Sequence, residues 1–179
     1  MAGGRKRLFF ALWPDEAVRA HLAALQTALP QAAGRWVHPD DLHITLQFLG
    51  SVEPERQACI AEAARAVHGE PFELEIDQID FWPKPRIAWA GPQEVPLPLR
   101  QLVKRLARHL RACGFQPEKR LYRPHVTLLR KTTPAAAMRL PEPIRWPVDH
   151  FVLVESRPGG DPPHYRPLEG WALEGGGED

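Results

Sequence analysis

The sequence predicts an α+β fold with two lobes, and two observations lead to this prediction. Segments of helical periodicity and segments of strand alternation follow one another without a strict βαβ order, which favours antiparallel sheets with the helices on the outside. The pattern His-x-Thr-Leu occurs at His43–Leu46 and again at His125–Leu128, and 125 − 43 gives a spacing of 82 residues, close to half of the chain. We therefore expect residues 1–179 to form one bilobal domain, in which two antiparallel sheets related by a pseudo-two-fold flank a central cleft.

Three segments place apolar side chains at helical spacing and are predicted helices: residues 15–29, 53–67 and 99–112. Asp15 is a typical N-cap of the first helix, and Gly114 is a typical stop after the third.

Strands are predicted where apolar and β-branched residues alternate with polar ones. Residues 165–168 and 171–173 could pair as a last hairpin. The proline-rich stretches at 141–143 and 157–163 predict loops, and the tail at 175–179 predicts disorder. The other predicted strands cover residues 7–13, 35–37, 42–49, 72–79, 86–90, 124–129 and 148–155.

Composition excludes some classes of protein. Charge is balanced, with 23 Lys and Arg against 22 Asp and Glu, which argues against a strong non-specific nucleic-acid binder.

Cys59 and Cys113 lie in helix-like segments far from a Cys-x-x-Cys spacing, so we expect two free, buried thiols in a reducing compartment. The apolar run at residues 8–13 is too short for a signal peptide, and no run is long enough to span a membrane. We expect a cytoplasmic monomer that makes no membrane contact.

The repeated motif suggests a chemistry. In a strand, residues i and i+2 project to the same face, so His43 shares a face with Thr45, and His125 shares one with Thr127. A pseudo-two-fold would place two imidazoles and two hydroxyls across one cleft. One imidazole could take a proton from a nucleophile while the other gives a proton to a leaving oxygen, as the cleavage of a phosphodiester requires. The threonine hydroxyls and Arg130 could then hold the non-bridging oxygens.

Two other interpretations compete with this one. A single His-x-Thr in a strand usually marks a packed histidine and a hydrogen-bonded threonine, but packing gives no reason for the same polar residues to recur. A metal site is the other alternative, yet no Asp, Glu or Cys stands at a ligand spacing near either motif. Asp40 and Asp41 precede His43, where we expect them to turn the chain. We therefore expect no metal and no cofactor.

The paired motifs resemble those of the 2H phosphoesterase superfamily. The wider context is similar to its RNA 2′,3′-cyclic phosphodiesterase branch, also called 2′-5′ RNA ligase or LigT-like. The similar stretches are RLFFAL at 7–12, RWV at 35–37, LHITLQFLG at 42–50, PRIAW at 85–89, PHVTLLR at 124–130 and YRPLEGWAL at 165–173.

This resemblance implies a bilobal fold, metal-free catalysis, and RNA 3′ ends with a 2′,3′-cyclic phosphate as substrate. It implies a 2′-phosphomonoester product, with His43 as proton donor to the 3′ oxygen and His125 as proton acceptor from water. Phe48, Trp36 and Tyr122 flank the motifs and could stack a nucleobase. For Phe48 we favour packing in the core.

Three other functions remain open at this point. The same site could join a cyclic phosphate to a 5′-hydroxyl as a 2′-5′ linkage, because microscopic reversibility permits both directions. The substrate could instead be a small cyclic nucleotide. The chain could also be a non-catalytic module that binds RNA ends, although such a module would not need both imidazoles.

Overall fold

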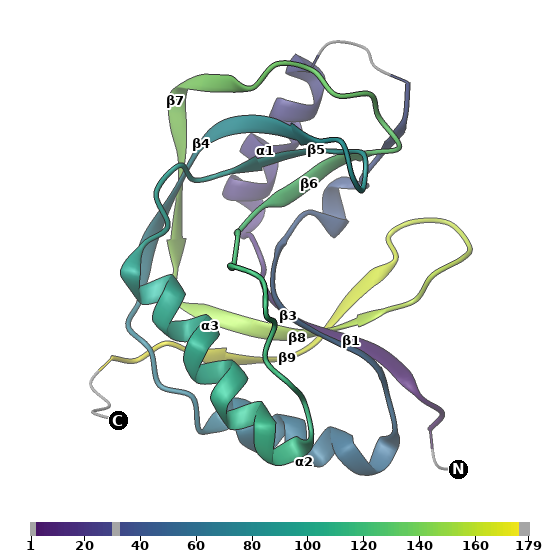
Figure 1. Ribbon diagram of the computed structural model, residues 1–179, viewed down its shortest axis with the longest axis vertical. Helices are drawn as coiled ribbons and strands as arrows, with labels where there is room; N and C mark the ends of the chain where they lie inside the picture. Colours follow the sequence, from purple (N-terminus) through teal and green to yellow (C-terminus); the bar gives the residue numbers. More distant parts are fainter. Residues whose placement is uncertain (1–2, 30–32, 176–179) are drawn as a thin grey trace.

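The computed structural model describes residues 3–29 and 33–175, and it confirms the α+β class (Figure 1). Of the predicted disordered tail, only Gly175 falls among the described residues. The helices are α1 (Glu16–Ala28), α2 (Pro54–Arg65) and α3 (Leu97–Leu110), with 3₁₀ turns η1 (Pro39–Asp41) and η2 (Arg111–Cys113). The strands are β1 (Lys6–Leu12), β2 (Arg35–Trp36), β3 (Ile44–Val52), β4 (Phe72–Trp82), β5 (Ile87–Gly91), β6 (Val126–Arg130), β7 (Met138–Val148), β8 (His150–Ser156) and β9 (Tyr165–Ala172).

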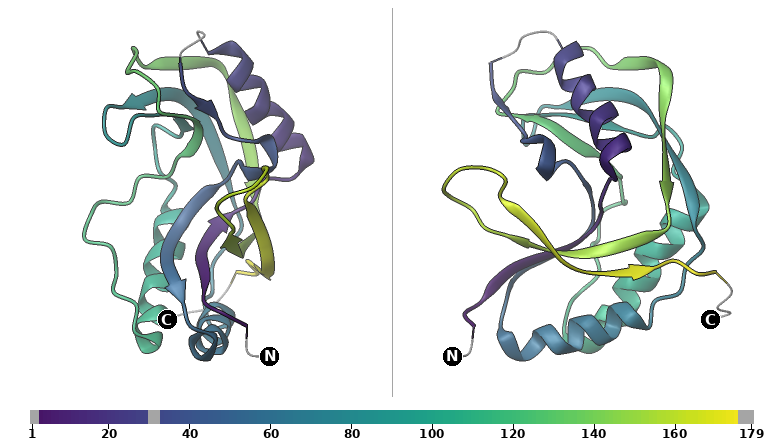
Figure 2. Two further views of the ribbon diagram at one scale, coloured as in Figure 1. Left: turned by 90° about the vertical axis from the view of Figure 1, so that its right-hand side faces the viewer. Right: turned by 180° about the vertical axis from the view of Figure 1, so that it is seen from behind.

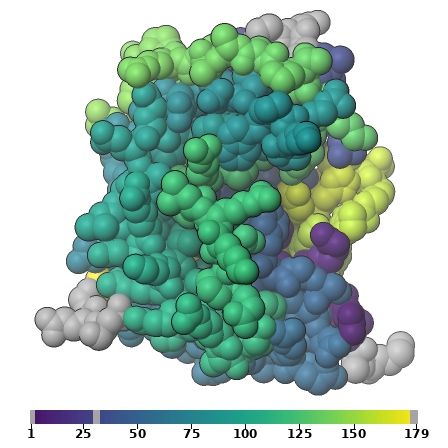
Figure 3. All heavy atoms as spheres, in the orientation of Figure 1, coloured from purple at the N-terminus to yellow at the C-terminus, as the bar shows by residue number. Residues whose placement is uncertain are grey.

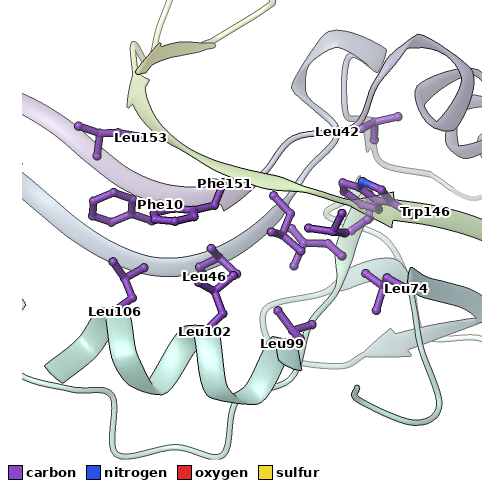
Figure 4. Close-up of a cluster of buried hydrophobic side chains, with 14 of the residues drawn as sticks. Phe10, Leu42, Leu46, Leu74, Leu99, Leu102, Leu106, Trp146, Phe151 and Leu153 are labelled. Atoms are coloured by element: carbon purple, nitrogen blue, oxygen red, sulfur yellow. The ribbon is translucent and has the colours of Figure 1, made fainter. Parts of the chain in front are cut away.

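The three predicted helices are present, and their ends follow the predicted signals. The Asp15 carboxylate caps α1 by accepting a hydrogen bond from the Val18 amide at 2.8 Å. After α3, the chain makes one 3₁₀ turn and stops at Gly114, whose φ of 87° is readily adopted only by glycine. Figure 4 shows how α3 packs: Leu99, Leu102 and Leu106 point toward the buried side chains of the sheet.

The strands form one sheet, and this corrects the expectation of two separate sheets. Among the described residues, nine strands pair in the order β7-β4-β5-β6-β3-β1-β8-β9, with β2 added to β6, and all pairs are antiparallel. The sheet divides into a first group, β7-β4-β5-β6, and a second group, β3-β1-β8-β9. The two groups meet where β3 lies beside β6, and Ile44 and Val126 are the one residue pair in register there. Figures 1 and 2 show the two groups turning away from each other at this junction, with α1 beside the first group and α2 and α3 beside the second.

Two predictions for the second half of the chain were wrong. Residues 141–143 were expected to be a loop but belong to β7, which is an edge strand paired only with β4. The β4–β7 register shifts between Ile76 and Gln78, so the prolines lie where regular pairing is interrupted and need not donate to the ladder. The expected hairpin at 165–173 is also wrong, because residues 165–172 form the single strand β9 along β8.

The two cysteines are joined, which corrects the prediction of free thiols. Cys59 of α2 and Cys113 of η2 form a disulfide, although 54 residues separate them in the chain. The side-by-side packing of α2 against α3 brings their Cα atoms to 5.8 Å. No local spacing signals this pairing, because it depends on how the two helices pack.

Membrane-spanning helices are absent from the part of the chain that the structure describes, since none of its helices has the required length and apolar composition.

Candidate active site

The two His-x-Thr motifs meet where the two halves of the sheet join. Ile44 lies directly opposite Val126 in an antiparallel pair. This direction places His43 beside Thr127 and Thr45 beside His125, as a local two-fold axis through the pair would do. Ile44 and Val126 are fully buried, whereas the two histidines and two threonines line a common cleft on the other face.

Both imidazoles are held in the same way. The Nδ1 atom of His43 lies 2.7 Å from the carbonyl oxygen of Asp41, and Nδ1 of His125 lies 2.8 Å from that of Arg123. A carbonyl can only accept, so Nδ1 carries the proton in each ring and Nε2 of the neutral ring has a free lone pair. The Thr45 hydroxyl, 3.0 Å from Nε2 of His43, can donate to that lone pair.

Aromatic rings fix both imidazoles from the side. His43 stacks on Trp13 at 5.5 Å and contacts Tyr165 edge-on at 5.1 Å between ring centroids. His125 meets Trp82 edge-on at 4.6 Å. These contacts limit ring rotation and remove much of the imidazole surface from water.

Burial is the main cause of the lowered pKa of both histidines. Burial lowers the pKa of His43 from 6.5 to about 4; Arg130 and His125 also lower it, while the hydrogen bond to the Asp41 carbonyl acts in the opposite direction. Burial, followed by the charge of Arg130, also lowers the pKa of His125. In the free protein the neutral form is therefore favoured at both positions, and an anion between the rings would favour protonation.

A β-bulge follows each motif and reorients the next side chains. Against β1, the register moves from Ala11–Thr45 to Phe10–Gln47, so Leu46 is an extra residue in β3. Against β5, it moves from Trp89–Thr127 to Ala88–Leu129, which makes Leu128 the extra residue in β6. An extra residue reverses the alternation of faces. The bulges therefore bring Phe48 and Arg130, each three residues beyond a motif threonine, to the cleft.

The cleft has a volume of about 450 Å³ and carries positive charge. Figure 3 shows the surface hollowed beside the green segment that runs up the front toward β6. Arg7, Arg120 and Arg130 line the cleft, and among its described lining residues none is Asp or Glu. Such a cleft suits an anionic ligand. The part of the chain that the structure describes contains no group of three His, Cys, Asp or Glu side chains that could hold a metal ion.

The three residues considered for stacking occupy different environments. Phe48 is 66% exposed and lines the cleft, so the expected packing in the core is wrong. Trp36 pairs with Leu129 and so projects to the face opposite Arg130, outside the residues that line the cleft. Tyr122 also lies outside that lining; its hydroxyl donates to the Thr45 carbonyl at 2.9 Å, and burial raises its pKa.

Asp41 connects His43 to the start of β9. Its carboxylate is buried and accepts hydrogen bonds from the amides of His164 and Tyr165 at 2.9–3.1 Å. Its carbonyl oxygen accepts a hydrogen bond from Nδ1–H of His43, and Tyr165 packs against the same ring. Asp41 does lie in a turn, as expected, but its side chain also holds the segment of Tyr165 against His43.

Sequence reasoning missed several residues of the cleft. Arg7, Trp82, Arg120 and Tyr165 all line it. They come from β1, β4, the segment before β6, and β9, so they meet only through long-range packing. Arg7 and Tyr165 had a usable signal, because they stand in the stretches RLFFAL and YRPLEGWAL that resemble the family.

Comparisons with known proteins identify the family of the chain. The profile of the 2′-5′ RNA ligase superfamily matches residues 14–160. The chain belongs to the 2′-5′ RNA ligase superfamily. Within the superfamily, the RNA 2′,3′-cyclic phosphodiesterase of Escherichia coli (strain K12) is 33% identical over 172 residues, which cover 94% of this chain and 97% of that relative. The RNA 2′,3′-cyclic phosphodiesterase of Thermus thermophilus is 34% identical over 188 residues, with 94% and 91% covered.

Solved structures show the same fold. The crystal structure of E. coli LigT complexed with 3′-AMP has a TM-score of 0.84 and 32% identity, and the match covers 94% of this chain and 98% of LigT. The crystal structure of TT0787 from Thermus thermophilus has a TM-score of 0.79 and 27% identity, with 93% and 97% covered. The resemblance predicted from the motifs is therefore confirmed at the level of family and fold.

Proposed function

We propose that this protein hydrolyses the 2′,3′-cyclic phosphate at the 3′ end of RNA to a 2′-phosphomonoester. The single observation that carries this proposal is the placement of two imidazoles across the Ile44–Val126 pair, each with Nδ1 bound to a backbone carbonyl and Nε2 as the unprotonated nitrogen of the neutral ring, in a cationic cleft. The relatives named RNA 2′,3′-cyclic phosphodiesterase support the substrate, and the LigT complex with 3′-AMP supports a nucleotide-sized ligand.

The proposed reaction is an in-line displacement at phosphorus. A water oxygen attacks the phosphorus atom and gives its proton to Nε2 of His125, while the bond from phosphorus to the 3′ oxygen breaks. The leaving 3′ oxygen takes a proton from Nε2 of His43, so a 3′-hydroxyl and a 2′-phosphate result. A second turnover requires one proton to return from His125 to His43 through solvent.

The remaining side chains serve the phosphate. Thr45 and Thr127 can each donate a hydroxyl proton to a non-bridging oxygen, and Arg130 supplies a fixed positive charge. The charge on the phosphate opposes the effect of burial on His43, so substrate itself helps His43 to hold the proton that it later donates. No cofactor or metal takes part in this scheme.

The test is turnover of a short RNA with a 2′,3′-cyclic end, with the product identified by phosphorus NMR. We expect the 2′-phosphomonoester alone, and an unchanged rate after dialysis against a chelator. A 3′-phosphate product, or loss of activity that a divalent ion restores, would contradict the scheme. Adding an RNA with a 5′-hydroxyl shows whether 2′-5′ joining competes, and wild-type binding without turnover would indicate an RNA-end binding module.

A further inference from the structure

A row of side chains leads out of the cleft on the Arg130 side. Arg130 of β6 lies opposite Ile87 of β5 on one side and opposite Arg35 of β2 on the other. Residues directly opposite in antiparallel strands project to the same face. Arg130 and Ile87 line the cleft, so the exposed Arg35 extends the same face beyond it.

Strand β2 is held firmly beside β6. The Val37 amide donates to the Leu128 carbonyl at 3.0 Å, and the Gln26 side chain donates to the carbonyls of both residues. A Cβ at Gly34 would lie 2.6 Å from the Arg130 carbonyl oxygen, so only glycine permits this close approach of the two strands. The position of Arg35 relative to Arg130 is therefore set by the backbone.

Three more cations stand at the ends of the adjacent strands. Lys84 and Arg86 lie in the turn between β4 and β5, and Lys131 follows β6. The Thr132 amide donates to the Arg86 carbonyl at 3.2 Å, and the Arg86 guanidinium lies 3.4 Å from the Lys131 carbonyl oxygen, which brings these segments together. We call the exposed cations Arg35, Lys84, Arg86 and Lys131 the basic rim.

The basic rim carries positive charge without acidic residues beside it in the sequence. Residues 33–38, 82–87 and 129–137 contain no Asp or Glu. In the described part of the chain, no member of the rim forms an ion pair with a carboxylate. The net charge of the whole protein is only +1, so the positive charge here is local. A local, unneutralised row of cations that begins inside an anion-binding cleft suits a ligand with several regularly spaced negative charges.

We propose that the basic rim binds the phosphodiester backbone of single-stranded RNA on the 5′ side of the terminal nucleotide. This inference rests on the proposed function, because it assumes that the terminal cyclic phosphate lies between the two histidines. The residue equivalent to Arg130 in the first motif is Phe48, so the row of cations continues from one motif and not from the other. The preferred substrate is then an RNA of several nucleotides and not a free cyclic mononucleotide.

Two substrates with the same terminal nucleotide test this proposal: a 2′,3′-cyclic mononucleotide and a short RNA ending in it. In the Arg35→Glu/Lys131→Glu variant, we expect kcat/KM for the RNA to fall about tenfold or more, and its salt dependence to weaken by about 0.7 in the log–log slope for each lost contact. Turnover of the mononucleotide should stay within about twofold of wild type, because the altered residues lie outside the cleft. Arg100→Glu/Lys104→Glu, two exposed cations on α3, is the control with the same change in charge and should show neither effect.

Several results would overturn the inference. Equal loss on both substrates would show that the rim acts on the cleft itself, and no loss on the RNA would show that the rim does not bind it. A selective loss for RNA in Arg7→Glu, with the rim variant unaffected, would place the RNA on the opposite side. Fluorescence anisotropy with a labelled RNA ending in a 3′-phosphate measures RNA binding without turnover. It therefore tests binding by the rim separately from the proposed hydrolysis. If the wild type turns over neither substrate, the proposed function fails, while weaker binding by the rim variant alone would still support the RNA path.

Discussion

Phe48 and Arg130 occupy equivalent positions in the two halves of the sheet, each three residues beyond a motif threonine and each brought to the cleft by a bulge at the intervening leucine. The two motifs thus supply the same imidazoles and hydroxyls to the cleft, and they differ at this pair. An aromatic ring faces one side and a guanidinium faces the other. A nucleotide has a flat base that suits the ring of Phe48 and a charged phosphate that suits the guanidinium of Arg130.

Phe48 gives the first prediction. Phe48→Ala should lower kcat/KM for a cyclic nucleotide, because the stacking of a base on an aromatic ring contributes about 1–3 kcal/mol. Its melting temperature should stay close to wild type, since the side chain is 66% exposed. Phe48→Tyr keeps the ring and should retain activity. A large loss of stability with unchanged kcat/KM would mean that Phe48 serves packing and does not contact substrate.

The lowered pKa of His43 predicts that stability depends on pH and that binding of an anion is coupled to protonation of the ring. Unfolded His43 titrates near 6.5 and folded His43 near 4, so the free energy of unfolding should decrease as pH falls from 6.5 toward 4. A bound phosphate favours the protonated ring. Calorimetry of phosphate binding near pH 6, in buffers of different ionisation enthalpy, should therefore show proton uptake. The His43→Ala variant should show less uptake, and equal uptake in both proteins would contradict this account of His43.

Asp41 gives a prediction that separates positioning from overall stability. Asp41→Ala leaves two backbone amides without their acceptor and frees the segment of Tyr165, so kcat should fall by about tenfold or more. Asp41→Asn keeps an acceptor oxygen and should recover most of the rate. It also removes a negative charge that raises the pKa of His43, so the limb of the kcat/KM profile that reports His43 should move to lower pH. Equal kcat in the wild type and the Ala variant would show that Asp41 does not position the ring.

The disulfide predicts a measurable difference between oxidised and reduced protein. Closing a loop across 54 residues should stabilise the folded state by about 4 kcal/mol through the entropy of the unfolded chain. Denaturation in urea with and without reductant measures this difference. The Cys59→Ala/Cys113→Ala variant should not respond to reductant. Identical midpoints for oxidised and reduced wild type would mean that the bond does not form.

Local patterns predicted the parts of the molecule that depend on local physics. The helix from Glu16 to Ala28 has its own cap and apolar stripe, and the repeated His-x-Thr signals two equivalent strands. By contrast, the exposure of Phe48 depends on a bulge that only the pairing of β3 with β1 defines. The edge strand β7 was missed for a similar reason, since its prolines are tolerated only where the β4 register shifts. Arg7, Arg120 and the disulfide likewise depend on contacts between distant segments.

The central claim is that His43 and His125 act as an acid–base pair, and a substrate with a much better leaving group than the 3′ oxygen tests it most directly. With the natural substrate, His43→Ala and His125→Ala should each lower kcat by about 10²-fold or more, and the double variant should lose much less than the product of the single losses. The good leaving group needs no proton, so it should restore turnover in His43→Ala and leave His125→Ala impaired. Restoration of His125→Ala alone would exchange the two roles. Near-wild-type turnover of the natural substrate by either single variant would contradict the two-histidine mechanism.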